Sequence, residues 1–237
     1  MKNVKFEDLI IQETDDLIAI NKPPYVSTLE DRKERINILK LAKNYCSNSQ
    51  VCHRLDKETS GLLLIAKHAN AYRHISIQFE KRRVEKTYHA MVSGIHNFKD
   101  HEIEAPIATL STGVVRIDNI EGKKAKTIVK TLQAHRKTTL VECKPLTGRM
   151  HQIRIHLALV KAPIIGDLQY GGKDFYLSWI KPNYNLKADT EEQPLIKRVA
   201  LHAFGLKFEG LDGKRVYLEA AYPKDFKVLV KQIEKHS

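Results

Sequence analysis

The chain has 237 residues, of which 42% are hydrophobic and 29% are charged, as in an ordinary soluble globular protein. Its apolar runs fall far short of the ~20 residues of a membrane-spanning helix, and its first residues lack the apolar core of a signal peptide. Three scattered cysteines argue against a disulfide framework. We therefore expect a cytoplasmic protein that does not bind membranes.

The net charge is +12, and it is distributed unevenly. Residues 1–35 carry eight acidic against six basic side chains, a net charge of −2, whereas residues 81–157 carry fifteen basic against seven acidic ones, a net charge of +8. A basic middle indicates a surface that meets a polyanion, and nucleic acid is the commonest soluble one. The alternative is a generally basic protein without such a partner.

The first ninety residues predict short strands and two helices. Pro23 and Pro24 end an early strand, since neither residue can donate to a strand ladder. Apolar residues at Ile36, Leu39 and Ala42 have helical spacing, whereas the unbroken apolar run after Gly61 is typical of a buried strand. We expect strands at 4–12, 17–22, 62–66 and 86–94, and helices at 33–46 and 68–79.

The second half predicts more strands than helices. Because strands and helices do not alternate strictly, the pattern favours an α+β fold in one domain spanning residues 1–237. The polar segment 181–197 is expected to be a surface loop, and 164–172 a turn rich in glycine. Strands are expected around Ile103 and at 114–117, 125–132, 138–143, 198–203, 206–208 and 216–218, and helices at 147–160 and 226–233.

The polar stretch 53–61 lies directly before the predicted buried strand, so it forms a loop at the mouth of that strand. Arg54 and Lys57 flank Asp56, and nearby cations favour an ionised carboxylate. Thr59, Ser60 and Gly61 suit a tight, held backbone. A solvated charged turn is the simpler alternative; a held carboxylate could instead be a nucleophile, an acid or base, or a metal ligand.

Arg154 has an unusual position on the helix predicted at 147–160. With ~100° per residue, Ile153, Leu157 and Val160 fall on one apolar arc, and Arg154 lies at its edge. A guanidinium turned inward has to be paired, although an arginine can also extend along its aliphatic stem to water. The loop that carries Asp56 is the place in the sequence that best suits a cation.

Other common sites do not fit. His151 and His156 are five residues apart rather than the four of a zinc-binding helix, and the cysteines lack metal-ligand spacing. No glycine-rich phosphate loop is present, and Ser60 precedes a strand rather than a helix, unlike a hydrolase nucleophile. We expect no metal and no cofactor, which leaves chemistry based on a carboxylate.

The stretch His53-Arg54-Leu55-Asp56-x-x-Thr59-Ser60-Gly61 resembles the signature loop of the RluA-type RNA pseudouridine synthases. Further motifs of that family follow its order along the chain, so that the resemblance covers about residues 15 to 220. They are Asn21-Lys22-Pro23, Lys86-Thr87-Tyr88, Thr147-Gly148-Arg149-x-His151-Gln152-Ile153-Arg154-x-His156, Gly166-Asp167-x-x-Tyr170-Gly171 and Leu201-His202-Ala203.

The resemblance implies a mixed, largely antiparallel central sheet flanked by helices and loops, with a basic cleft. It implies an isomerase that converts uridine in RNA, either tRNA or rRNA, to pseudouridine. We expect the protein to act as a monomer. Asp56 would be the catalytic aspartate, Tyr88 would stack on the flipped base, and Arg154 would pair with Asp56. The candidates for RNA contact and base flipping are Arg54, Arg149, His151, Gln152 and Ile153.

Two departures from the family pattern are visible. About 15 residues precede the first matched strand, so we expect no N-terminal S4-type RNA-binding module. After the Lys-Pro motif, Pro24-Tyr25 stand where the family commonly has a glycine.

Two other functions remain open. One is an RNA-binding or RNA-folding protein without catalysis; the other is a cofactor-free hydrolase of nucleosides, which the basic middle of the chain disfavours.

Overall fold

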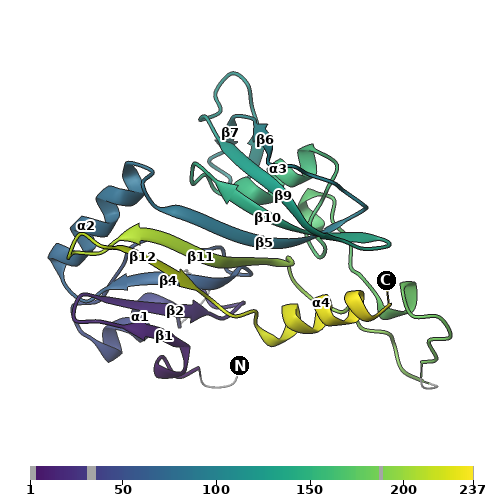
Figure 1. Ribbon diagram of the computed structural model, residues 1–237, viewed down its shortest axis with the longest axis horizontal. Coiled ribbons are helices and arrows are strands. Elements are labelled where there is room, and N and C mark those ends of the chain that lie inside the picture. Colours follow the sequence, from purple (N-terminus) through teal and green to yellow (C-terminus); the bar gives the residue numbers. More distant parts are fainter. Residues whose placement is uncertain (1–3, 31–35, 187–188, 237) are drawn as a thin grey trace. The chain divides into compact units, whose positions relative to one another are not determined.

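The computed structural model describes residues 4–30, 36–186 and 189–236 (Figure 1). It divides into two compact units, each built from two stretches of the chain. Unit 1 comprises Met1–Thr87 and His202–Tyr222, and unit 2 comprises Tyr88–Leu201 and Pro223–Ser237. Both contain helices and mostly antiparallel strands, which confirms the α+β class. The expectation of one domain stays a prediction.

Unit 1 is a sheet with two helices. The strand β4 pairs antiparallel with β2 and in parallel with the start of β11, and β12 pairs antiparallel with residues 205–209 of β11. Its strands are β1 (Ile10–Glu13), β2 (Leu17–Lys22), β3 (Gln50–Val51), β4 (Ser60–Ala66), β11 (Leu201–Glu209) and β12 (Arg215–Glu219). Its helices are α1 (Ile38–Tyr45), α2 (Ala69–Glu80) and the 3-10 turn η1 (Glu7–Leu9).

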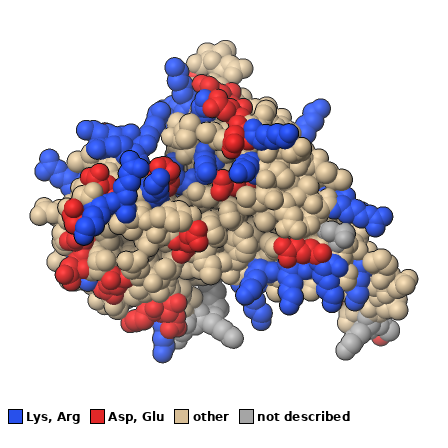
Figure 2. Space-filling view, in the orientation of Figure 1, with Lys and Arg blue, Asp and Glu red and all other residues tan. Residues whose placement is uncertain are grey.

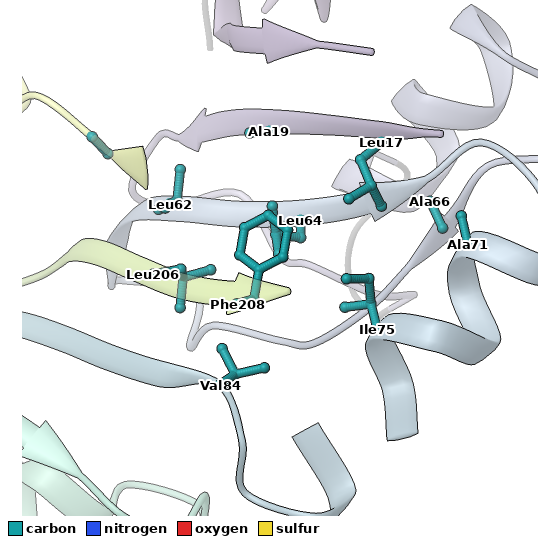
Figure 3. Close-up of a cluster of buried hydrophobic side chains, with 11 residues drawn as sticks. Leu17, Ala19, Leu62, Leu64, Ala66, Ala71, Ile75, Val84, Leu206 and Phe208 are labelled. Carbon is teal, nitrogen blue, oxygen red and sulfur yellow. The ribbon is translucent and has the colours of Figure 1, made fainter. Parts of the chain in front are cut away.

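The core of unit 1 lies between this sheet and α2 (Figure 3). Every residue of β4 is buried, as the continuous apolar run predicts for a strand covered on both faces. Phe208 of β11 extends toward Leu64 of β4, while Ile75 of α2 covers the same cluster. The predicted helix at 68–79 is confirmed, and His68 caps it by accepting a hydrogen bond from the backbone N–H of Ala71.

In unit 2 the strands β5, β10, β9 and β6 pair antiparallel in that order, and β7 and β8 form a separate hairpin. Its strands are β5 (Glu85–Ser93), β6 (His101–Glu104), β7 (Ile107–Thr109), β8 (Val115–Ile117), β9 (Lys126–Ala134) and β10 (Thr138–Pro145). Its helices are α3 (Gln152–Leu159) and α4 (Lys224–His236), with 3-10 turns η2 (Leu168–Tyr170) and η3 (Leu177–Trp179).

Several boundaries differ from the predictions. Within the strand predicted at 4–12, Glu7–Leu9 form the 3-10 turn η1 and β1 begins only at Ile10, and β11 begins only at Leu201. The helix predicted at 147–160 begins only at Gln152, because residues 147–151 form a turn in which His151 has a φ of 53°. The strands predicted at 198–203 and 206–208 are one strand, β11, since Gly205 does not interrupt its ladder. The strand β7 was not predicted, and residues 33–35 of the first predicted helix lie outside the described residues.

Within the described part of the chain, every helix is too short or too polar to cross a membrane.

Candidate active site

The loop that carries Asp56 is held in place by the segment 22–28 of unit 1. The backbone N–H of Tyr25 donates to the carbonyl of Lys57 at 2.8 Å. Thr28 forms two hydrogen bonds with the backbone of Leu55. Its hydroxyl donates to the Leu55 carbonyl at 2.8 Å and accepts from the Leu55 N–H at 3.1 Å. Asp56 itself is half-buried. Because its two neighbours, Leu55 and Lys57, are both hydrogen-bonded to segment 22–28, the backbone that carries the Asp56 side chain is fixed.

Lys22 is a second support of this loop, and its side chain is fully buried. Its ammonium donates to the carbonyls of Pro23 and Val26 at 2.9 Å each and to that of Lys57 at 3.2 Å. A buried ammonium is costly unless acceptors surround it. The cation therefore ties the turn after β2 to the residue that follows Asp56, which explains why an Asn-Lys-Pro motif accompanies the loop.

Gly61 and Ser60 fix the end of the loop against β11. Gly61 has a φ of +119°, and a Cβ there would lie 2.2 Å from the carbonyl oxygen of Ala203. The hydroxyl of Ser60 hydrogen-bonds Nδ1 of His202 at 2.9 Å, and Nε2 of His202 donates to the carbonyl of Ala220 at 2.9 Å. The Thr-Ser-Gly and Leu-His-Ala motifs are thus two sides of one parallel strand contact.

His53, at the start of the loop, is a structural histidine. Its Nε2 accepts the backbone N–H of Leu64 at 3.1 Å, and its ring stacks on Phe79 with 4.7 Å between centroids. Burial, assisted by the nearby Lys86 charge, lowers the pKa of His53 to about 3. Burial, with Arg82 nearby, also lowers the pKa of Lys86 to about 8. His53 is therefore neutral at pH 7 and anchors the loop to β4.

The other two predicted catalytic residues belong to unit 2. Tyr88 is half-buried on β5, where it lies opposite Cys143 of β10. Arg154 is on α3, and its side chain is 11% exposed. A pairing of Arg154 with Asp56 would join residues of different units, and it stays a prediction.

Within unit 2, Arg154 forms a bidentate ion pair with Asp167. Its Nε and one terminal nitrogen donate to the two carboxylate oxygens at 2.7 and 2.8 Å. Gln169 accepts a further hydrogen bond at 3.2 Å, and the guanidinium carbon lies 5.0 Å from the centre of the Tyr170 ring. Asp167 is 1% exposed. The guanidinium does turn inward, as its place on the apolar arc predicts, and the turn after α3 orients it.

His151 belongs to the same group, because its Nδ1 lies 2.9 Å from the hydroxyl of Tyr170. Its left-handed backbone ends the turn directly before α3. Arg149, half-buried in that turn, donates from Nε to the carbonyl of Lys124 at 3.3 Å. Arg54, in unit 1, is exposed. RNA contacts by Arg54, Arg149 and His151 stay predictions.

Gln152, a predicted RNA contact, is hydrogen-bonded within unit 2. Its side chain is 4% exposed, and its amide oxygen accepts from the Thr147 hydroxyl at 2.6 Å and from the Arg149 N–H at 3.0 Å. Its amide nitrogen donates to the Lys126 carbonyl and the Thr127 hydroxyl. With every hydrogen-bonding atom used inside unit 2, Gln152 positions the turn at 147–151, and its contact with RNA stays a prediction. Ile153 is likewise buried, at 6% exposure.

His156 completes this network below Gln152. Its Nε2 donates to the Ala105 carbonyl at 3.1 Å, since a carbonyl can only accept, so its Nδ1 accepts from the Thr127 hydroxyl at 2.9 Å. Burial lowers the pKa of His156, which matches this neutral form. The motif from Thr147 to His156 therefore contains two buried positioning residues, Gln152 and His156. Arg154, from the same motif, forms its ion pair with Asp167.

Two supporting residues were not singled out from the sequence, Lys22 and Asp167. Both lie in motifs that the sequence displays, but nothing local marks them as buried, and a lysine or aspartate beside a proline or glycine normally belongs to a solvated turn. Among the described residues, no three His, Cys, Asp or Glu side chains lie close enough together to hold a metal ion.

The sequence is similar to that of known RNA-modifying enzymes. The family model for RNA pseudouridylate synthase matches residues 16–159, more than half of the chain. Ribosomal large subunit pseudouridine synthase C of Vibrio vulnificus is 32% identical over 210 residues, which cover 87% of this chain and 63% of that protein. The protein of the same name from Rickettsia felis is 35% identical over 224 residues, covering 91% and 68%. The chain thus spans about two thirds of the length of these relatives.

Two solved structures share the fold. Human RNA pseudouridylate synthase domain containing 4 has a TM-score of 0.72 at 22% identity, covering 97% of this chain and 95% of that one. Human RNA pseudouridylate synthase domain containing 1 has a TM-score of 0.70 at 27% identity, covering 94% and 87%. The fold is therefore that of pseudouridine synthases, and with the family match over residues 16–159 the chain belongs to the RNA pseudouridylate synthase family.

Proposed function

We propose that this chain is an RNA pseudouridine synthase, an isomerase that converts specific uridines of RNA to pseudouridine with Asp56 as the catalytic aspartate. The observation that carries the proposal is the fixed loop at 53–61, in a chain of this family. A pure RNA-binding protein has no need of a carboxylate held in place by Thr28, Lys22 and the Gly61 contact. Ribosomal RNA is the first substrate to test, because the relatives are named for it.

The chemistry follows from what the isomerisation requires. The C–N glycosidic bond of the uridine breaks, the detached uracil turns, and its C5 forms a C–C bond to the same ribose. C5 then loses its proton and N1 gains one, so atoms and electrons balance without a redox partner. The base has to leave its helix to be reached. In the proposed roles Asp56 is the nucleophile, toward either the ribose or the uracil ring. Tyr88 holds the detached uracil by stacking, and Arg154 is the proposed charge partner of the catalytic carboxylate.

The buried residues around these groups are positioning residues. Lys22, Ser60 and His202 hold the Asp56 loop within unit 1, while Asp167 and Gln152 hold the Arg154 helix within unit 2. Fixed donors and acceptors cost no reorganisation during the reaction, which is where much enzymatic rate enhancement originates. The proposal places the enzyme in the cytoplasm, acting as a monomer.

The test is pseudouridine mapping on RNA from cells that lack the protein, followed by complementation with wild type or Asp56→Asn. Wild type should restore pseudouridine at one or a few uridines, and Asp56→Asn should restore none while binding the same RNA with unchanged affinity. Asp100→Asn, a change at an exposed loop aspartate, is the matched control and should restore modification. Turnover by Asp56→Asn near that of wild type would remove Asp56 from its role, and an unaltered map in the deletion strain would contradict the function.

A further inference from the structure

The C-terminal helix α4 (Lys224–His236) has one buried and one basic face. Phe226, Leu229, Val230 and Ile233 are buried in unit 2. The opposite face carries four exposed lysines. They lie at helical spacings of three, four and four residues: Lys224, Lys227, Lys231 and Lys235.

These lysines form a straight row rather than a scattered charge. At ~100° per residue they fall within roughly 80° of one another around the axis, and at ~1.5 Å per residue they extend over about 16 Å. Figure 2 shows basic side chains gathered over α4, with acidic side chains beside them. A nucleic-acid strand carries one phosphate per roughly 3.4 Å of duplex axis. The row is therefore long enough to follow about five consecutive phosphates.

The helix that carries the row is firmly anchored. Arg198, which is 1% exposed, donates from two guanidinium nitrogens to the carboxylate of Asp225 in the first turn, at 2.7 and 3.0 Å. Burial tends to raise the pKa of Asp225, but the hydrogen bonds and charge of Arg198 outweigh it and hold that pKa below its usual value. Arg198 also donates to the carbonyls of Val199 and Leu201. The lysine row is thus presented by a fixed element.

The row is not neutralised within the described part of the chain. Other surface lysines have carboxylate partners. The nitrogen-to-oxygen distance is 2.7 Å between Lys126 and Glu102 and 2.8 Å between Lys67 and Glu13. No carboxylate of a described residue lies within ion-pair distance of the four lysines of α4. Asp225, the acid of the first turn, is committed to Arg198. Glu234, three residues after Lys231, lies beside the row without an ion pair to it, so the four aligned lysines still give this face of α4 a net positive charge.

We propose that the lysine row of α4 is an accessory RNA-binding surface, which contacts the phosphate backbone of the substrate at a distance along the chain from the predicted catalytic residues. This inference rests on the proposed function for the identity of the polyanion. A membrane is the weaker partner, because interfacial helices insert an apolar face, and the apolar face of α4 is already buried. A contact with phosphates does not depend on the base sequence. It therefore contributes to the affinity for RNA and does not select which uridine is modified.

The experiment compares Lys227→Gln/Lys231→Gln/Lys235→Gln with wild type. Glutamine has nearly the helix propensity of lysine, so α4 should remain folded. The matched control is Lys43→Gln/Lys99→Gln/Lys173→Gln, which removes the same charge from three exposed lysines on separate segments. The dissociation constant for a substrate RNA fragment is measured from 50 to 300 mM salt, and single-turnover pseudouridine formation is followed at saturating enzyme.

The row variant should bind RNA with a log K against log salt slope that is shallower by about 2 to 3, since each lost phosphate contact removes roughly 0.7 to 0.9. Its affinity at 100 mM salt should fall tenfold or more, while its single-turnover rate at saturation stays within twofold of wild type. The control should change the slope by less than one. An unchanged slope in the row variant, or row-dependent binding to anionic phosphatidylglycerol vesicles instead of RNA, would overturn the inference.

The two proposals fail separately in this experiment. Absence of pseudouridine formation by wild type on any RNA would refute the proposed function, yet the binding slopes would still report whether α4 contacts RNA. Pseudouridine formation by wild type, with equal slopes for the row variant and wild type, would refute the lysine row alone. A saturating rate that falls with the row variant would place these lysines in positioning of the reaction instead of in accessory binding.

Discussion

Asp167 holds Arg154 in a bidentate ion pair that is almost entirely buried. Replacing Asp167 by Asn leaves the guanidinium without its charge partner, so we expect Asp167→Asn to lower the free energy of unfolding by roughly 3 kcal/mol. Glu85→Gln, which breaks the exposed pair of Glu85 with Lys207, is the control and should cost less than about 1 kcal/mol. Urea unfolding measures both; equal midpoints would mean that the Asp167 pair is not needed for stability.

His53 predicts a pH dependence of stability. Its folded pKa of about 3 lies below the unfolded value of 6.5, so between these values the unfolded state binds more protons than the native state. Stability is therefore full above about pH 6.5 and declines as the pH falls toward 3. His53→Gln should flatten this decline, although it lowers stability at pH 7. Urea midpoints at pH 7, 6, 5 and 4 for both proteins test the effect; parallel curves would contradict it.

For single residues, the sequence reveals candidate reactive groups more readily than it reveals which polar side chains are buried. Asp56 stands out because cations and a permissive glycine surround it, and Arg154 stands out because it shares an arc with apolar residues. Gln152 does not stand out in the sequence as a buried residue. Nothing in the sequence shows that Thr147, Lys126 and Thr127 will form hydrogen bonds with its side-chain amide. Lys22 is hidden for the same reason: its three carbonyl acceptors are brought together by the chain path.

Among the secondary-structure elements, the contact of β4 with β11 depends on the absence of a side chain at Gly61. Gly61→Ala would place a Cβ at 2.2 Å from the Ala203 carbonyl and force a residue with a side chain to a φ of +119°. We expect the parallel pairing to separate and the protein to lose most of its stability and its pseudouridine formation. The signal to measure is the melting temperature, with recovery of soluble protein as a second readout.

Gly213→Ala is the matched control for Gly61→Ala. Gly213 also has a positive φ, of 76°, but nothing lies within 4 Å of the added Cβ. Only the backbone strain remains, which costs about 1 kcal/mol. If both variants melt alike, the close approach to Ala203 does not hold the Asp56 loop, and only the backbone conformation matters.

Elements whose pattern is purely local were predicted well. The continuous apolar run specifies β4, and helical spacing with a capping His68 specifies α2. The start of α3 was placed five residues too early, because Gly148, Arg149 and His151 are compatible with a helix until the Gln152 network pulls residues 147–151 into a turn. β7 is three residues long and depends on pairing with β8, which no local pattern shows.

The basic charge acts through the whole molecule. The excess of +8 over residues 81–157 and the lysine row of α4 come from different parts of the sequence, and both lie mainly in unit 2. The composition alone predicts a polyanionic partner. The row on α4 is not apparent from composition, because residues 224–236 also contain Asp225 and Glu234. Helix geometry places Asp225 away from the lysines, whereas Glu234 is a neighbour of Lys231 on the helix surface.

RNA affinity should therefore depend steeply on salt. If six or more phosphates are neutralised, log K should fall with log salt with a slope of about −4 or steeper, because each contact releases a bound counterion. The Asp56→Asn variant, which loses the proposed chemistry but no cation, should have the same slope or a slightly steeper one. Filter binding of one RNA fragment from 50 to 300 mM salt measures both proteins. A flat affinity across this range would show that the basic surface does not meet phosphates, and it would remove the electrostatic support for an RNA substrate while leaving the geometry of the Asp56 loop unchanged.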